Sequence, residues 1–423
     1  MLSIFRPNRA PIELIKDMVT YAWAKAIPGL AGFFGVLLFI HWLGTEEFGK
    51  YSLAFSFVNM CTAFSFAWFN QSIIRYYSKL RIEGILNSVL SGGWLFSVLI
   101  TIGLILGSQL INFPEVSSIS LLLVLSIAIG TFSMVLVLLQ SNRQASKVVQ
   151  MNILQATLFI FGPFFIVTYF GKTHENVLGG LIFSYTVPVI LFLWIRGIGF
   201  WNFEYDKISS SLKKLFLFGY PLSLWFASSL SLRFLDRYFL EYFLGLEQMG
   251  SYAGYAEIFT RLFSLILFPI TMALHPYLTH QWNNGQEKLV IKTLKWGLVL
   301  QGGIFILVFL FLFIFQEWVL SILAIIAPGL NAEMNHVVLP IFIGGFLWQW
   351  SLLIHKPLEL MEKTNHMLIF MIGVVAVNII GNILFLPKIG AIATAYTLIA
   401  SALGYNLLVC IASRNFWIGK FQP

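Results

Sequence analysis

A few ionisable side chains lie inside long apolar segments of this chain, where a charge is costly unless it faces a cavity or a partner. Glu257 and Arg261 are four residues apart, a spacing that places both on one face of a helix. Arg261, near the middle of its segment, could grip phosphate oxygens with its planar donor fork, while Glu257 adjusts the local charge. Alternatively, the two residues neutralise each other and only lower the cost of membrane insertion.

A second charged group precedes this pair and consists of Arg233, Asp236 and Arg237. Spacings of three and four residues predict that Asp236 approaches Arg233 and that Arg237 lies beside Arg233 on one helix face. The group carries a net positive charge, so it could attract a diphosphate or a sugar near the outer mouth, or pair across a cavity. An interfacial helix end, with arginines that extend to the membrane surface, explains the same pattern.

Lys25 lies in the first quarter of the first apolar segment. It could meet a substrate that enters from the cytoplasm, or its side chain could extend back to the inner interface. Several tryptophans could stack on sugar rings, although tryptophan in membrane proteins commonly anchors a helix at the interface. These are Trp23, Trp68, Trp225, Trp348 and Trp350.

Other kinds of chemistry lack their motifs in this sequence. The 7 histidines show no metal-ligand spacing, and Cys61 and Cys410 form no metal or disulfide pattern. There is no phosphate-binding G-x-x-x-x-G-K-[ST] loop, no G-x-S-x-G and no paired-carboxylate arrangement. We therefore expect no cofactor, no bound metal and no enzymatic activity.

The composition indicates what positions these residues. Hydrophobic residues make up 58% of the chain and charged residues only 10%, which is more apolar surface than one soluble core can hide. The net charge of +8 does not indicate nucleic-acid binding, because the basic residues are spread over short connections and form no patch. The sequence therefore predicts an integral membrane protein.

A bilayer core requires about 20 apolar residues per helix, and the chain contains about twelve such segments. The first begins after a basic N-terminus and is too long for a signal peptide, so we expect it to be a retained helix. The expected spans are 19–43, 51–74, 85–108, 118–140, 148–170, 178–195, 215–240, 248–274, 290–316, 335–355, 366–386 and 390–412.

The distribution of basic residues predicts the orientation. With the N-terminus inside, the cytoplasmic connections carry most of the Lys and Arg residues, whereas the outer connections carry Lys50, Lys172 and Lys388. Short cytoplasmic loops are rich in these residues in membrane proteins. We therefore expect both termini to be cytoplasmic.

An internal repeat divides the chain. Residues 43–51 read LGTEEFGKY and residues 244–252 read LGLEQMGSY, and each copy joins the first two spans of its half. The copies are separated by an even number of spans, so the halves have the same orientation and form parallel repeats. The predicted fold is all-α, with two parallel six-helix lobes, 1–200 and 201–423, around a central cavity.

Two further segments carry a resemblance to a known family. Residues 236–256 read DRYFLEYFLGLEQMGSYAGYA, which resembles the D-R-x-x-L-x-x-x-x-G-x-x-x-x-G-x-Y segment of polysaccharide-export flippases. Residues 378–395 read NIIGNILFLPKIGAIATA, which is similar to that family's C-terminal stretch. The matching positions in that stretch are Asn378, Asn382, Pro387, Gly390, Ala393 and Thr394.

This family belongs to the multidrug/oligosaccharidyl-lipid/polysaccharide exporter superfamily. The resemblance implies a flippase that moves oligosaccharide repeat units on undecaprenyl diphosphate across the bacterial inner membrane, for O-antigen, capsule or exopolysaccharide synthesis. It also implies polysaccharide polymerase and chain-length machinery as partners. Arg261, Arg233, Arg237, Lys25, Asp236 and Glu257 are then the expected substrate-binding residues.

Two alternatives remain open. A cation-coupled multidrug antiporter of the same superfamily would be expected to carry an intramembrane carboxylate in its first half, and the first six spans contain no such residue. A membrane polysaccharide polymerase or glycosyltransferase would be expected to carry an extensive polar loop, whereas the outer connections here are short.

Overall fold

The computed structural model describes residues 10–110, 117–142, 144–196 and 205–419, and nearly all of them are helical. Eleven helices in this part of the chain are long and apolar enough to cross a membrane. The first of these is two helices joined at Gly44. The chain is therefore an all-α membrane protein with about twelve membrane helices, as the sequence predicts.

The helices follow one another with short connections. Their bounds are α1 (Ala10–Ile82), α2 (Leu86–Gln109), α3 (Ile119–Ser141), α4 (Ala145–Phe170), α5 (His174–Arg196), α6 (Tyr205–Leu244), α7 (Leu246–Asn283), α8 (Glu287–Ile314), α9 (Gln316–Ile326), the 3-10 helix η1 (Ala332–Val337), α10 (Val338–Ile354), α11 (Lys356–Leu360), α12 (Thr364–Ile389), α13 (Ile392–Ala412) and α14 (Arg414–Trp417).

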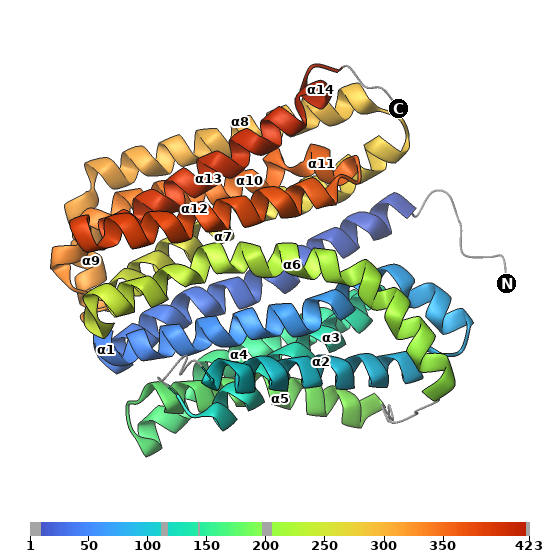
Figure 1. Cartoon of the computed structure of the whole chain (residues 1–423), viewed down its shortest axis with the longest axis horizontal. Coiled ribbons are helices and arrows are strands. Elements are labelled where there is room, and N and C mark those ends of the chain that lie inside the picture. Colours follow the sequence, from blue (N-terminus) through green and yellow to red (C-terminus); the bar gives the residue numbers. More distant parts are fainter. Residues whose placement is uncertain (1–9, 111–116, 143, 197–204, 420–423) are drawn as a thin grey trace.

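The two copies of the sequence repeat adopt the same turn. Gly44, inside α1, has a φ of 71°, and Gly245, between α6 and α7, has a φ of 84°. A positive φ is readily adopted by glycine, which lacks a Cβ atom. Each copy thus reverses the chain and forms a tight helical hairpin, as Figure 1 shows at the left of the view.

These hairpins also pack against each other. A Cβ atom added to Gly250 would lie 2.0 Å from the Thr45 carbonyl oxygen, and one added to Gly49 would lie 2.7 Å from the Leu246 carbonyl oxygen. Backbone therefore meets backbone at this end of the molecule. The close approach requires glycine at both positions, because no larger residue leaves that space.

The helices of the first half pack together, as do most helices of the second half (Figure 1). Between the halves, α1 packs along both α6 and α7. The largest hydrophobic cluster spans this contact, with Phe39 and Tyr51 of α1 beside Phe259 of α7 and Phe342 of α10. The core therefore joins the two halves along their inner helices.

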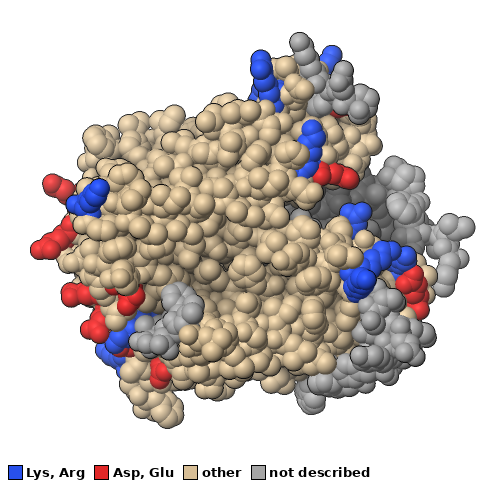
Figure 2. Space-filling model, viewed as in Figure 1, with Lys and Arg blue, Asp and Glu red and all other residues tan. Residues whose placement is uncertain are grey.

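Charged side chains gather at the two ends of the molecule. Figure 2 shows most of the visible Asp and Glu residues at the end that holds the glycine hairpins, and most of the visible Lys and Arg residues at the other end. The broad band between them presents almost no charge on this face. Such a band matches the hydrocarbon core of a bilayer.

The structure adds one element that the span pattern did not predict. The short helix α9, with 11 residues, follows α8 directly and leads to η1. Its length is too small to cross a bilayer, which requires about 20 residues. The helix α7, with 38 residues, also extends well beyond the predicted span 248–274.

Candidate functional site

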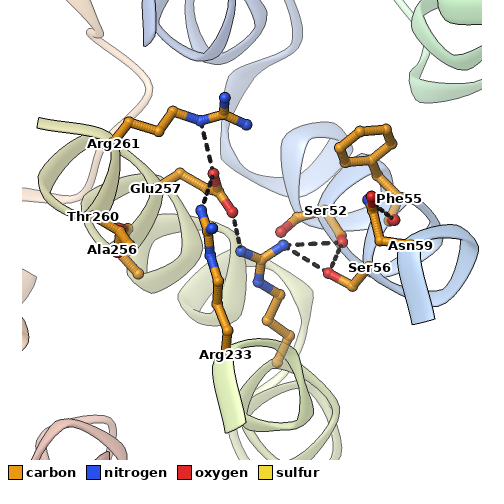
Figure 3. Close-up of polar contacts among 10 residues, drawn as sticks. Ser52, Phe55, Ser56, Asn59, Arg233, Ala256, Glu257, Thr260 and Arg261 are labelled. Atoms are coloured by element: carbon orange, nitrogen blue, oxygen red, sulfur yellow. Dashed lines mark hydrogen bonds and ion pairs between the residues drawn. The ribbon is translucent and has the colours of Figure 1, made fainter. Parts of the chain in front are cut away.

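Glu257 of α7 lies at the centre of a cluster of three arginines (Figure 3). Arg261 Nε donates to Glu257 Oε2 at 2.8 Å, and Arg233 Nη2 donates to the same oxygen at 3.2 Å. Arg237 Nη2 donates to the other carboxylate oxygen, Oε1. The predicted Glu257–Arg261 pair is confirmed, and the carboxylate also holds the two arginines of α6.

The hairpin at Gly245 explains why these residues meet. Arg233 precedes Gly245 by 12 residues (245 − 233) and Glu257 follows it by 12 residues (257 − 245). Residues at equal distances from a hairpin turn lie at the same level of its two helices. With a rise of 1.5 Å per residue, that level is roughly 18 Å from the turn. The cluster therefore lies deep within the span.

The arginines also contact the first half of the chain. Arg237 Nη1 donates to the Ser56 hydroxyl oxygen at 2.7 Å and to the Ser52 carbonyl oxygen at 3.2 Å, both on α1. A Cβ atom added to Gly32 of α1 would lie 2.1 Å from Arg261 Nη1, so this glycine makes room for the guanidinium. The cluster thus lies between the two halves.

The cluster has an excess of positive charge. Three arginines share one carboxylate, which leaves two more positive than negative charges. The side chain of Arg237 is only 4% exposed, whereas those of Arg233 and Arg261 are 35% and 21% exposed. Arg237 is therefore held by its protein partners, and Arg233 and Arg261 still present donors to an incoming anion.

A small cavity of about 40 Å³ adjoins the cluster and is lined by Arg233, Arg237, Glu257 and Trp348, among others. This volume has room for a few water molecules and is too small for a diphosphate. A diphosphate would therefore have to contact the exposed parts of the Arg233 and Arg261 side chains.

Asp236 does not pair with Arg233, and this part of the sequence prediction was wrong. The aspartate is buried and accepts a hydrogen bond from Asn382 Nδ2 of α12 at 3.4 Å. Thr394 of α13 donates to Asn382 Oδ1 at 2.8 Å, and Asn382 Nδ2 also donates to the Asn378 carbonyl oxygen at 3.0 Å. Arg233 pairs with Glu257 instead. Asn382, a residue of the family-like C-terminal stretch, is thus a hydrogen-bond partner of Asp236.

Lys25 and the tryptophans named as candidates from the sequence differ in where the structure places them. The side chains of Lys25 and Trp23 lie outside the described residues, so the role of Lys25 stays a prediction. Trp68 is completely buried and packs in a hydrophobic cluster, which indicates a structural role. Trp225 lines a second cavity, described next.

The second cavity, of about 460 Å³, was not predicted from the sequence. It is lined by residues of α6, α7, α10, α11 and α12 together with Gln71 of α1, and it contains the polar residues His275, His355, Lys356 and Glu359. The histidines have no metal-ligand spacing, so the sequence did not indicate that His275 and His355 share a cavity. The spacing of Lys356 and Glu359, three residues apart, was the one local clue to an ion pair.

Comparisons with known proteins place the fold. The profile of one protein family, described as polysaccharide biosynthesis protein, matches residues 14–282. An uncharacterized membrane protein of Methanocaldococcus jannaschii is 24% identical over 399 residues, which cover 86% of this chain and 76% of that protein.

Two solved structures share the architecture. The lipid II flippase MurJ, in an inward closed conformation, superposes with a TM-score of 0.68 at 18% identity, covering 95% of this chain and 92% of that one. A multidrug resistance MATE family transporter of the MOP superfamily, in its inward-facing conformation, gives a TM-score of 0.67 at 13% identity, covering 94% and 97%. At such identities the likeness shows a common fold.

Proposed function

Because the chain belongs to the polysaccharide biosynthesis protein family of the MOP superfamily, we propose that it is a flippase for lipid-linked oligosaccharides. Its substrate is an oligosaccharide repeat unit on undecaprenyl diphosphate. The protein moves this unit from the inner to the outer leaflet of the bacterial inner membrane, in the synthesis of O-antigen, capsule or exopolysaccharide. Polysaccharide polymerase and chain-length machinery are the expected partners downstream.

The arginine cluster around Glu257 is the observation that carries this proposal. Its two surplus positive charges match the negative charge of a diphosphate. Arg233 and Arg261 present planar donor groups, which bind phosphate oxygens in pairs. Deep in a membrane span such a cationic surplus is costly, and a bound diphosphate would offset that cost.

The packing of the helices suggests how the substrate crosses. The glycine hairpins close one end of the molecule, where Gly49 and Gly250 meet. The cavity of about 460 Å³ lies toward the opposite end, which the basic residues predict to be cytoplasmic. Substrate enters from that side, its diphosphate binds the arginines and its polyprenyl tail stays in lipid. Rocking of the two halves then opens the hairpin end.

The position of the buried carboxylates favours the flippase over a cation-coupled drug antiporter. Among the described residues, the buried carboxylates are Asp236 and Glu257, and both lie in the second half. Glu257 is occupied by three arginines, so it is poorly placed to exchange a coupling ion.

Deletion of the gene tests the proposal in cells. We expect surface polysaccharide to fall while lipid-linked repeat units accumulate in the inner leaflet, because synthesis continues and export stops. Extraction of the lipid-linked pool and its quantification by mass spectrometry measure this. Normal polysaccharide together with altered drug tolerance would instead support the antiporter.

A further inference from the structure

The cavity of about 460 Å³ contains a group of polar residues that the diphosphate site does not use. Lys356 Nζ donates to Glu359 Oε2 at 2.5 Å and lies 3.0 Å from His275 Nδ1. His355 Nε2 lies 3.9 Å from the same Glu359 oxygen. Lys356 and Glu359 carry opposite charges that cancel. When the histidines are neutral, the cavity therefore has no net charge. It is therefore unlike the arginine cluster and poorly suited to a diphosphate.

The cavity wall still offers hydrogen-bonding groups. The side chains of His275 and Glu359 are 48% and 34% exposed, and Gln71 reaches the cavity from α1 with an exposed side chain. These groups include donors and acceptors. An uncharged ligand with many hydroxyl groups would satisfy both kinds.

Aromatic side chains line the same cavity. Trp225 and Phe226 of α6 and Phe268 of α7 contribute to the wall, and the Phe226 side chain is 46% exposed. The Trp225 ring is held edge-to-face by the His355 ring, with 5.5 Å between the ring centroids. An aromatic face next to hydrogen-bonding groups suits a sugar ring, which has apolar faces and a polar rim.

The cavity is also in line with the arginine cluster. Trp225, Ser229 and Arg233 recur every four residues on α6 and line the two cavities in turn. Eight residues of helix separate Trp225 from Arg233 (233 − 225), which corresponds to about 12 Å. A ligand with its diphosphate at Arg233 could therefore extend its sugars toward Trp225. The volume falls in the range of roughly 300–1,000 Å³ that small-ligand sites occupy.

We propose that this cavity, lined by Trp225, Gln71, His275 and Glu359, is the sugar-binding subsite that selects the oligosaccharide of the substrate. Trp225 stacks on a sugar ring. Glu359, His275 and Gln71 form hydrogen bonds with the hydroxyl groups of the sugar. This inference rests on the proposed flippase function, because it assigns the second part of the same ligand.

Two ligands separate the sugar subsite from the diphosphate site. One is the lipid-linked oligosaccharide extracted from host cells that lack the gene, and the other is undecaprenyl diphosphate without sugar. The purified full chain in detergent is titrated with each ligand, and the Kd is measured by thermophoresis. We expect the unaltered protein to bind the sugar-bearing ligand more tightly.

Trp225→Ala and Gln71→Ala should each weaken binding of the sugar-bearing ligand, by about tenfold for the tryptophan. Neither should change binding of undecaprenyl diphosphate. Trp225→Phe, which keeps an aromatic ring, should retain most of the affinity.

Trp296→Ala is the matched control, because Trp296 is 60% exposed on α8, outside the cavity, and it should change neither Kd. Gln71→Ala removes an exposed side chain, so it tests the subsite without disturbing the fold.

The outcomes are distinguishable. Equal affinity for the two ligands in the unaltered protein, or equal loss for both ligands in Trp225→Ala and Gln71→Ala, would overturn the sugar subsite and leave the flippase intact. If the deletion strain accumulates no lipid-linked oligosaccharide, or if undecaprenyl diphosphate does not bind at all, the flippase proposal itself fails.

Discussion

Glu257 is the residue on which the cationic cluster depends. Its carboxylate is buried and accepts hydrogen bonds from three guanidinium groups. A buried charge is tolerated when it is paired and hydrogen-bonded, and removal of one partner leaves an uncompensated charge. Glu257 therefore fixes the arginines, whereas the exposed parts of Arg233 and Arg261 are available to a ligand.

Replacement of Arg261 tests the diphosphate contact. Arg261→Gln should cut export strongly with near-normal protein level in the membrane, because a lost charge-assisted contact costs about 1.5–3 kcal/mol, or roughly one to two decades in affinity. Arg261→Lys should be intermediate, since lysine keeps the charge but lacks the planar fork. Export is measured as surface polysaccharide, with Arg414→Gln, an exposed arginine of α14, as the control.

The double variant Glu257→Gln with Arg261→Gln separates binding from mere neutralisation. If Arg261 serves only to neutralise Glu257, removal of both charges should restore export. Full recovery in the double variant would rule out the substrate contact. We expect no recovery, because Glu257 is also the partner of Arg233 and Arg237.

At the scale of elements, the two glycine hairpins control the closed end of the molecule. Gly44 and Gly245 allow the turns through their positive φ values, and Gly49 and Gly250 allow the hairpins to touch. The contact joins the first half to the second. Any conformation that opens this end must separate the two copies of the repeat.

Gly250→Ala should shift the protein toward a conformation open at the hairpin end. The added Cβ atom would lie 2.0 Å from the Thr45 carbonyl oxygen, a distance that the backbone must relieve by moving apart. Spin labels on cysteines at Lys79 and Lys363, measured by electron double resonance, should then report a shorter distance across the opposite end.

Gly303→Ala serves as the control for that experiment, since a Cβ atom there meets nothing within 4 Å. It should leave the distance distribution unchanged. A distribution for Gly250→Ala that equals the one for Gly303→Ala would show that the hairpin contact does not govern opening.

At the scale of the whole molecule, contacts between loops identify which connections share an end. His174, at the start of α5, bonds Glu47 of the first hairpin through its backbone nitrogen at 2.9 Å and through Nδ1 at 2.7 Å. At the other end, Arg81 bonds Asn142 at 3.1 Å. The alternation of the spans assigns each connection to one end of the molecule. These hydrogen bonds join connections that were assigned to the same end.

Reporter fusions test which end faces the cytoplasm. Fusions after Lys79 and Lys288 should report the cytoplasm, and those after His174 and Glu333 the outer side, because basic connections are retained inside. Alkaline phosphatase, active only outside, and a fluorescent protein, bright only inside, give opposite readouts. A uniform reversal would invert the predicted orientation, and a single reversed fusion would mean an incorrectly counted span nearby.

The membrane fold, most of the spans, the hairpin repeat and the Glu257–Arg261 pair could be predicted from the sequence. Each of these depends on residues close together in the chain. The lipid core sets span length, a tight reversal needs glycine, and helical geometry brings residues four apart together.

Which helices face each other could not be predicted from the sequence and follows from the folded structure. It joined Arg233 and Arg237 to Glu257, turned Asp236 toward Asn382, and brought His275 to Lys356. In a water-soluble helix the apolar face identifies the side that packs inward. Membrane helices are apolar on the lipid side as well, so their sequence carries a much weaker signal of rotation. The contacts between helices are therefore fixed by packing and by the pairing of buried charges, which appear only when the chain is folded.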